Sequence, residues 1–337
     1  MRARWATSPG IALMGPDAPS QVGAWARAAE RAGLGSAWII EDYFHPGAYA
    51  LAAAAAAVTE RLAIGLGVVN PYTRHPALLA METAALAGIA PGRVVLGLGS
   101  SNRRWIEAQM GIPFKAPLGG LRESVAIVRR LLAGERVTIR GDVFTIDDVE
   151  LEWAPPEPVP VLLGVKGPKA LRLADEIADG VLCSVLASPG HVHRVRRTAG
   201  AGRPGFSVVA YVIMAVSSDG GAARAAVRPL IARYLGVLHG QSILRDAGLG
   251  PDRTQSFRDA LVQGSPAVHL VDDLLIDALS VAGTPEQCRR QLARWAEAGL
   301  DAPIAVLPPD ADRMEQLARC AEMLVPAWRE LSDARPC

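Results

Sequence analysis

Lysine is scarce in this sequence. Of the 35 basic residues, only Lys115, Lys166 and Lys169 are lysines, and the 34 acidic residues leave a formal net charge of +1. A charge this small excludes a strong electrostatic attraction to nucleic acid or to an anionic membrane surface. We therefore expect a small-molecule substrate and neither a nucleic-acid nor a membrane partner.

Cysteine is scarce as well, and no apolar run is long. The four cysteines, at positions 183, 288, 320 and 337, form no C-x-x-C pair, so the sequence predicts neither a metal site nor a disulfide framework. The apolar run at residues 52–58 is far shorter than the ~20 residues that span a bilayer. The beginning of the chain lacks the basic region, apolar stretch and cleavage site of a secretory signal. We expect a cytoplasmic enzyme.

A repeated pattern of short apolar runs dominates the sequence. Each run is followed by a turn rich in glycine, proline or aspartate and then by an amphipathic stretch. Most runs lack period-two alternation, which is typical of strands buried on both faces of a parallel sheet. Eight such runs predict a single (β/α)8 TIM barrel over residues 1–337, with a doubly wound open sheet as the alternative. The runs cover residues 11–14, 37–40, 63–69, 94–98, 161–163, 180–183, 206–216 and 303–307.

Two segments interrupt this pattern. Residues 135–150 contain two alternating runs around Gly141 and Asp142, which predicts a β-hairpin insertion with its strands near 137–146. Residues 236–270 form a longer insertion before the last βα unit, for which we expect helices and loops. Long insertions often cover the mouth of an active site and can equally be surface decoration, so its role stays open.

Two helices have clear terminal signals. Residues 21–32 predict a helix that ends at Gly33, because glycine readily adopts the left-handed conformation that closes a helix. Thr284, Pro285 and Gln287 supply a cap, a first-turn proline and a capping-box partner, which predicts a helix running to residue 298.

The segments that follow the apolar runs are rich in polar and special residues. They read MGPD, EDYFHP, NPYTRHP, GLGSSNRRW, GVKGPK, CSVLASPG and SSDG. In a (β/α)8 barrel these loops meet at one rim, the carboxyl ends of the strands, where active sites lie. The candidate site residues are therefore sought in these loops.

Four segments carry a family resemblance. They are GVVNPYTRHP at 67–76, RVVLGLGS at 93–100, GVKGPKALRLADEIADGV at 164–181 and AGTPEQCRRQLARWAEAGLD at 282–301. Together they resemble the bacterial luciferase-like superfamily, and within it the coenzyme F420-dependent methylenetetrahydromethanopterin reductases. The resemblance implies a barrel fold, a homodimer and a deazaflavin cofactor, F420, with FMN as the alternative.

The segment around Gly67 is the most informative of these. Gly67 lies inside an apolar run, where glycine weakens a strand unless the backbone bulges or approaches a ligand. The resemblance implies a bulge with a non-prolyl cis peptide between Gly67 and Val68 that supports the ring of the cofactor. Asn70 could hydrogen-bond the polar edge of that ring, or it could cap the turn before Pro71.

Two adjacent acids, Glu41 and Asp42, follow the second apolar run. Successive side chains of a strand alternate in direction, so one acid should face the site and the other the surrounding helices. Many members of the superfamily have Asp-His here, so the resemblance places Asp42 at the position of a histidine and makes it a candidate for proton exchange with the ring or substrate. Both acids could also be solvated loop residues. His45 is a nearby substitute, and His75, before Pro76, has a structural rather than a catalytic role.

Gly97 lies near the end of the fourth run, and Gly99 and Ser100 follow it. The glycines allow close approach of the backbone to a ligand, and their pattern is not that of a dinucleotide fingerprint. The F420-dependent sugar-phosphate dehydrogenases carry a catalytic acid where this chain has Ser100, and the methylenetetrahydromethanopterin reductases carry one near Ala12. This chain has neither acid, so we expect its substrate to be neither glucose 6-phosphate nor methylenetetrahydromethanopterin.

A phosphate site is predicted at Gly164, Val165, Lys166, Gly167 and Pro168. Backbone amides at a helix N-terminus attract an anion, and Pro168 presets the helix. The cationic side chain of Lys166 would add charge to this site. A solvated loop with a capping proline is the alternative for this segment.

Further cations in two loops bear on the choice of cofactor. Lys169, Arg103 and Arg104 could contact the acidic tail of F420, and the two arginines could equally lie on a solvated helix face.

The function expected from the resemblance is that of an F420-dependent oxidoreductase. Such an enzyme transfers hydride between the deazaflavin and a small organic substrate with a C=N, C=C or C=O bond. Two alternatives remain open, an FMN-dependent luciferase-like monooxygenase and a non-catalytic flavin-binding barrel. The alanine-rich helix expected at residues 49–58 offers an apolar face for the implied homodimer.

Overall fold

Eight parallel strands close into a barrel in the computed structural model, which describes residues 3–14, 17–200, 202–309 and 312–334. Each strand pairs with its neighbours in parallel register, and the pairing of β8 with β9 closes the ring. This confirms the predicted (β/α)8 barrel. The barrel strands are β1 (Gly10–Leu13), β2 (Ser36–Ile39), β3 (Ala63–Val69), β4 (Val94–Leu98), β7 (Val161–Leu163), β8 (Gly180–Cys183), β9 (Ser207–Val216) and β11 (Ala302–Val306).

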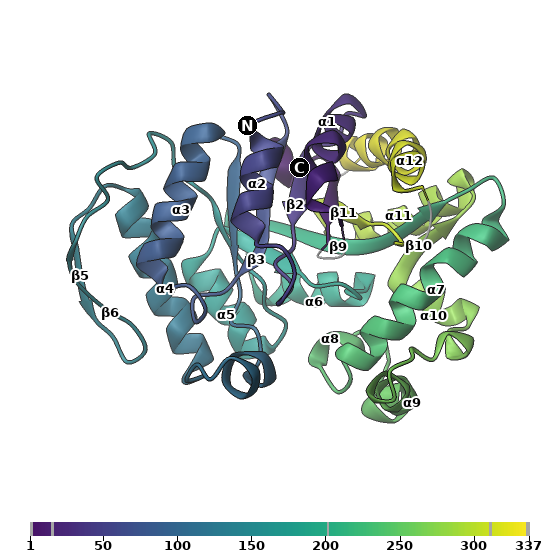
Figure 1. Ribbon diagram of the computed structural model, residues 1–337. Helices are drawn as coiled ribbons and strands as arrows, with labels where there is room; N and C mark the ends of the chain where they lie inside the picture. The colour runs from purple at the N-terminus through teal and green to yellow at the C-terminus, as the bar shows by residue number, and fades with distance from the viewer. Residues whose placement is uncertain (1–2, 15–16, 201, 310–311, 335–337) are drawn as a thin grey trace.

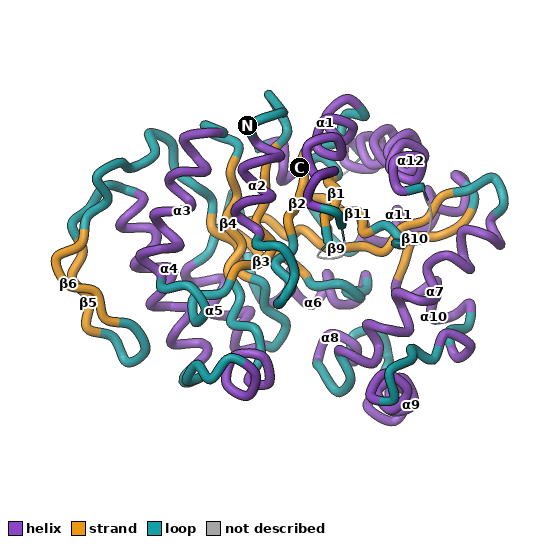
Figure 2. Tube along the Cα trace, viewed as in Figure 1, coloured by secondary structure: helices purple, strands orange, loops and turns teal. Residues whose placement is uncertain are grey.

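Helices surround the strands, as the tube view shows (Figure 2). Both predicted helix ends are confirmed. Gly33 closes the first helix with a φ of +84°, and Thr284 and Gln287 form a complete capping box. The helices of the ring are α1 (Val22–Arg31), α2 (Ala48–Ala56), α3 (Pro76–Ile89), α4 (Pro117–Leu132), α5 (Pro168–Ile177), α6 (Pro189–Thr198), α7 (Gly220–Val237), α11 (Pro285–Glu297) and α12 (Arg313–Asp333).

The two predicted insertions lie on opposite sides of the barrel (Figure 1). The antiparallel hairpin of β5 (Val137–Arg140) and β6 (Thr145–Val149) confirms the first. The second contains α8 (Ser242–Arg245) and α9 (Pro251–Val262), followed by α10 (Asp273–Leu279). The sequence did not predict the short strand β10 (Ser280–Gly283), which pairs in parallel with the carboxyl-terminal part of β9.

Large aromatic side chains fill the barrel interior, and glycines on neighbouring strands make room for them. Trp38 of β2 is fully buried, and its indole nitrogen donates to the Ser36 hydroxyl at 3.0 Å. A Cβ added at Gly65 of β3 would lie 2.4 Å from the Trp38 ring. The interior is therefore a packed core, and a cavity opens at the carboxyl ends of the strands.

The described cysteines, Cys183, Cys288 and Cys320, are free and buried, and Cys337 lies outside the described residues. Within the described ranges no group of acidic, histidine or cysteine side chains could hold a metal ion. The described helices include none with the length and apolar character needed to cross a membrane.

Candidate functional site

A cavity of about 870 Å³ opens at the carboxyl ends of the barrel strands. Its volume lies within the range of small-molecule and cofactor sites. Ten of the residues predicted from the sequence line it together: Glu41, Asp42, Gly67, Val68, Asn70, Gly99, Ser100, Gly164, Val165 and Lys166. The structure thus brings residues from four separate loops to one site.

The floor of the cavity is built around the Val68 side chain. The register of β3 against β4 shifts between Leu66 and Val69, which marks a bulge, and the Gly67–Val68 peptide bond is cis. An added Cβ at Gly99 or at Gly164 would lie 2.6 Å from a methyl carbon of Val68. These two glycines therefore make the space that the isopropyl group occupies.

The backbone of the bulge is held from across the barrel. The Tyr211 hydroxyl of β9 donates to the carbonyl oxygen of Gly67 at 2.7 Å, in a buried position. A Cβ at Gly67 would lie 2.1 Å from that hydroxyl oxygen, so only glycine fits there. Burial raises the pKa of Tyr211 well above its ordinary value, with Asp42 as a smaller cause, so the phenol remains protonated and able to donate.

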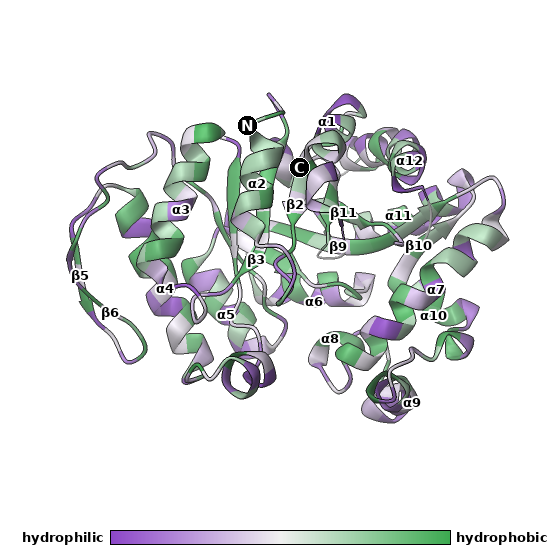
Figure 3. Ribbon diagram, viewed as in Figure 1, coloured by the Kyte–Doolittle hydropathy of each residue, from purple (hydrophilic) through white to green (hydrophobic). Residues whose placement is uncertain are grey.

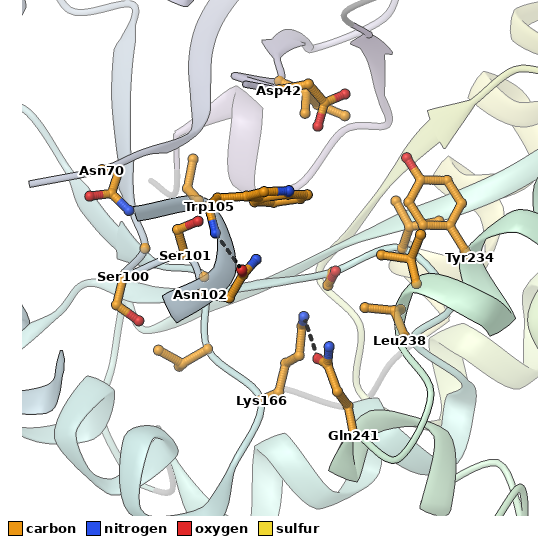
Figure 4. Close-up of a pocket in the computed structure, with 18 of the residues that line it drawn as sticks. Asp42, Asn70, Ser100, Ser101, Asn102, Trp105, Lys166, Tyr234, Leu238 and Gln241 are labelled. Carbon is orange, nitrogen blue, oxygen red and sulfur yellow. Dashed lines mark hydrogen bonds between the residues drawn. The ribbon is translucent and has the colours of Figure 1, made fainter. Parts of the chain in front are cut away.

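Asn70 combines the two roles that the sequence left open. Its side-chain oxygen accepts from the backbone amide of Tyr72 at 2.6 Å and so caps the turn after β3. Its side-chain nitrogen is buried and has no hydrogen-bond partner among the described residues. That nitrogen points into the cavity (Figure 4). A buried donor without a partner costs free energy unless a ligand accepts from it.

The predicted phosphate segment leads from β7 into α5. Gly167 is the N-cap of α5 and Pro168 its first residue; neither lines the cavity. No side chain caps the first-turn amides, and open space surrounds the position where a Cβ of Gly167 would lie. Helix α5 therefore presents free amide donors, and its N-terminal dipole favours an anion.

Lys166 extends into the cavity rather than into solvent. Its Nζ donates to Oε1 of Gln241, from the insertion, at 2.9 Å (Figure 4). Burial lowers the pKa of Lys166 to about 8, because a low-dielectric environment disfavours the ammonium form. Its carbonyl oxygen accepts from Arg194 at 2.9 Å and from Ser242 at 3.2 Å. A cation is thus placed beside the start of α5.

The two adjacent acids after β2 differ in their partners. Glu41 forms an ion pair with Arg74 at 3.3 Å, and Arg74 also pairs with Glu82 of α3 at 2.9 Å. Asp42 has no ion-pair partner in the described part of the chain, and its carboxylate faces the open cavity (Figure 4). Asp42 is therefore the acid that is free to interact with a ligand.

A second tyrosine lies across the cavity from Asp42. Tyr234, near the end of α7, directs its hydroxyl toward the side of the cavity on which Asp42 lies (Figure 4). Burial raises the pKa of Tyr234 to about 12, with the Asp42 carboxylate as the second cause. The phenol therefore stays protonated at neutral pH and can donate a hydrogen bond to a substrate atom between the two side chains.

Comparison with known proteins identifies the family. Residues 1–302 match the family described as luciferase-like monooxygenase. The chain belongs to this family. It is 30% identical over 308 residues to a 5,10-methylenetetrahydromethanopterin reductase from Methanolobus tindarius, covering 89% of this chain and 94% of that protein.

Two further comparisons involve F420-dependent proteins. The coenzyme F420-dependent tetrahydromethanopterin reductase structure from Methanopyrus kandleri superposes with a TM-score of 0.85 at 26% identity, covering 96% of this chain and 99% of the other. An F420-dependent glucose-6-phosphate dehydrogenase from Beutenbergia cavernae is 38% identical over 179 residues, about half of each chain. The predicted resemblance is thereby confirmed.

The remaining candidates of this luciferase-like chain lie outside the cavity, with one exception. His45 is exposed, and His75 caps α3 by accepting from the Ala77 amide at 3.2 Å. Lys169 is exposed on α5. Arg103 is paired with Glu107. Arg104 is the exception, because it lines the cavity without a described partner.

Several lining residues were not singled out from the sequence. Trp105 follows β4 on a π-helical turn (η3, Arg104–Gln109), and its indole lies in the cavity (Figure 4). π-Helical turns occur often at functional sites, but they leave no reliable pattern in a sequence. Four more come from α7 and the insertion, where the presence of a long insertion was the available signal: Tyr234, Leu238, His239 and Gln241.

The packing around Val68 makes a test of the site possible. We predict that Gly99→Ala lowers the free energy of unfolding by about 1–3 kcal/mol, because the new methyl group would overlap the stiff, β-branched Val68. Adding Val68→Ala should restore a large part of the loss in a double-mutant cycle measured by urea unfolding. Gly119→Ala in α4 is the control, because its Cβ would make only an ordinary 3.6 Å contact with Ala116, the N-cap of that helix. If the effects of Gly99→Ala and Val68→Ala on the free energy of unfolding were additive, contact with Val68 would not be the reason that glycine is needed at position 99.

Proposed function

We propose that this chain is an F420-dependent oxidoreductase that transfers hydride between the deazaflavin and a small organic substrate with a C=N, C=C or C=O bond. The observation that carries the proposal is the buried, unpartnered amide nitrogen of Asn70, which shares one cavity with the Val68 floor and with Lys166, beside the start of α5. Such a donor suits the polar edge of a flavin-like ring. The similarity to F420-dependent reductases supports the same cofactor.

The residues along the cavity fit the successive parts of such a cofactor, from its ring to its phosphate. Val68 and Asn70 would support and orient the ring, and Gly99, Ser100 and Gly164 would line the passage beyond it. The amides at Gly167 and the start of α5, with Lys166 beside them, would hold the phosphate. When bound, F420 supplies or accepts a hydride, and the protein contributes binding, orientation and electrostatics.

Asp42 is the proposed proton-exchanging group. Reduction of a C=O or C=N bond adds a hydride to carbon and a proton to oxygen or nitrogen, and oxidation removes both. The Asp42 carboxyl faces the cavity, and the protonated Tyr234 phenol could donate a hydrogen bond to the same oxygen or nitrogen atom. Glu41, held by Arg74, is a positioning residue for this loop.

An FMN-dependent monooxygenase is the second candidate, because the family is named for that activity. A non-catalytic flavin-binding barrel is the third. The cations near the start of α5 favour F420, since its lactyl-phosphate and polyglutamate tail carries more negative charge than FMN does. Lys166 and the unpaired Arg104 could both contact that tail.

We predict that the protein binds F420 at least about tenfold more tightly than FMN, because several charge-assisted contacts to the tail add to one another. Lys166→Ala should weaken F420 binding and reduce its dependence on salt. Fluorescence titration of both cofactors at low and high ionic strength measures this. Tighter binding of FMN, or an unaffected Lys166→Ala variant, would favour the monooxygenase instead.

The pH dependence of binding follows from the same lysine. In the protein without cofactor the pKa of Lys166 is about 8. The wild-type affinity for F420 should therefore fall as the pH rises through 8, because the ammonium group loses its proton and its charge. Lys166→Ala should lack this component, which also controls for titration of the cofactor itself. Lys166→Arg should retain its charge and move the fall to higher pH.

Asp42→Asn tests the proton-exchange role. The variant should lose about 10²-fold or more in turnover, because general acid–base catalysis contributes about 10²–10⁴. Its dissociation constant for F420 should change less than about threefold. Turnover is measured with reduced F420 and a panel of imines and enones. Undiminished turnover in Asp42→Asn would assign the proton transfer to another group.

A homodimer is proposed from the apolar outer surface of α2 and α3, which pack side by side. The exposed residues of α2 are alanines, as expected from the sequence, and those of α3 include Leu78, Met81 and Ile89. Leu78, Met81 and Ile89 are 46–51% exposed. Both helices are hydrophobic over most of their length (Figure 3). An apolar surface of this kind marks an interaction site, and a second copy of the chain would cover it.

The dimer prediction concerns mass in solution. Wild-type protein at micromolar concentration should have twice the chain mass of 35.5 kDa by light scattering. Met81→Glu should shift it to the monomer, because a carboxylate would be buried without a partner. Leu274→Glu, which changes a 74% exposed leucine of α10, should leave the dimer intact. A wild-type mass of 35.5 kDa would contradict the proposal.

A further inference from the structure

The side of the cavity opposite Asn70 and Ser100 is built from α7 and the insertion (Figure 4). We call this surface the insertion wall and define it by five residues that line the cavity: Tyr234, Val237, Leu238, Leu261 and Val262. Four of the five side chains are aliphatic. None of the cofactor contacts proposed above uses them, so the wall faces the space left for a substrate.

Charge is nearly absent from this side. Of the lining residues from the insertion, Arg258 alone is charged, and its side chain is exposed at the edge of the cavity. Lys166 is assigned above to the phosphate of the cofactor and donates to Gln241 at 2.9 Å. His239 has its Nδ1 2.9 Å from the Thr254 hydroxyl. A phosphate group on a substrate would therefore find no free buried cation on this wall.

Two aliphatic residues of the wall remain open to solvent. Val237 is 41% exposed and Val262 is 77% exposed. Covering such surface with an apolar ligand is favourable in proportion to the area removed from water. The apolar surface therefore continues from the interior of the cavity to its mouth.

Polar recognition is concentrated at the inner end. The Asp42 carboxylate and the Tyr234 hydroxyl approach this space from two sides (Figure 4). Together they suit one carbonyl or hydroxyl group. The aliphatic residues of the wall offer no hydrogen-bond partner to further hydroxyl groups, such as those of a sugar, each of which would need one on burial.

The insertion is attached to the barrel at the end of α8. Asp246 accepts from Arg194 of α6 at 2.8 Å and lies 2.6 Å from the Nδ1 atom of His191, which is fully buried. A Cβ at Gly190 would lie 2.5 Å from the Asp246 carbonyl oxygen, so the end of α8 packs directly against the start of α6. Helices α7 and α9, which carry the wall, pack against each other on either side of this attachment in the chain, and this favours a wall that a ligand need not order.

We propose that the insertion wall is the substrate-binding surface and that it selects an uncharged molecule with one carbonyl or hydroxyl group on an apolar body. This inference rests on the proposed function, because it takes the opposite side of the cavity to be the cofactor site. It assigns the insertion a role in specificity and disfavours phosphorylated sugars as substrates.

A homologous series of ligands tests the proposal. Binding of methyl ketones from 2-butanone to 2-decanone is measured by calorimetry with F420 present at saturation. The affinity should rise about two- to fourfold for each added methylene until the wall is covered. Glucose 6-phosphate should not displace the longer ketones. A flat series, or tighter binding of the sugar phosphate, would overturn the proposal.

Matched variants locate the effect on the wall. Val262→Asp should weaken 2-decanone binding at least about fivefold and 2-butanone binding less than about twofold. Leu274→Asp likewise replaces an aliphatic side chain by a carboxylate, at a 74% exposed residue of α10 outside the cavity, and should behave as wild type. Equal effects in both variants would contradict a specific role for the wall.

A separate F420 titration distinguishes failure of the proposed insertion wall from failure of the proposed function. If F420 binds normally but the ketone series is flat, the insertion wall is not the substrate surface and the proposed function stands. If F420 fails to bind the wild-type protein, the proposed function fails, and with it the assignment of substrate to this side.

Discussion

Crowding around the Val68 side chain is the constraint on which the site depends. The bulge in β3 directs this side chain at two neighbouring loops, and Gly99 and Gly164 leave room for it by having no side chains of their own. The same bulge exposes the Gly67 carbonyl to the Tyr211 hydroxyl and places Asn70 where β3 ends. One irregularity in one strand thus organises the floor of the cavity, and the other loops are positioned around it.

The regular parts of the fold could be predicted because they leave local patterns. Strands buried on both faces appear as uninterrupted apolar runs, and all eight runs are barrel strands. The cap at Thr284 and the hairpin around Gly141 also depend on residues close together in the chain. The strand β10 was missed, because its four residues, ending in Gly283, are too few to make a recognisable run.

The site could be predicted only in part, because contacts between residues far apart in the sequence determine the roles of some of its side chains. The sequence placed Glu41 and Asp42 at the site and required them to point in different directions. Arg74, 33 residues further along, determines which of them is neutralised. The attachment of the insertion through Asp246 and His191 joins residues 55 apart, and no periodicity in the sequence reports such a contact.

The hydrogen bond between Lys166 and Gln241 links the two halves of the cavity energetically. An ammonium group has three N–H donors, so Lys166 can bind an anion at the start of α5 while it keeps its hydrogen bond to Gln241. Gln241 fixes the direction in which the lysine side chain extends, and any effect of this contact on anion binding is matched by an equal effect of the anion on the contact. The phosphate loop and the insertion are thus connected through one side chain, although 75 residues separate Lys166 from Gln241.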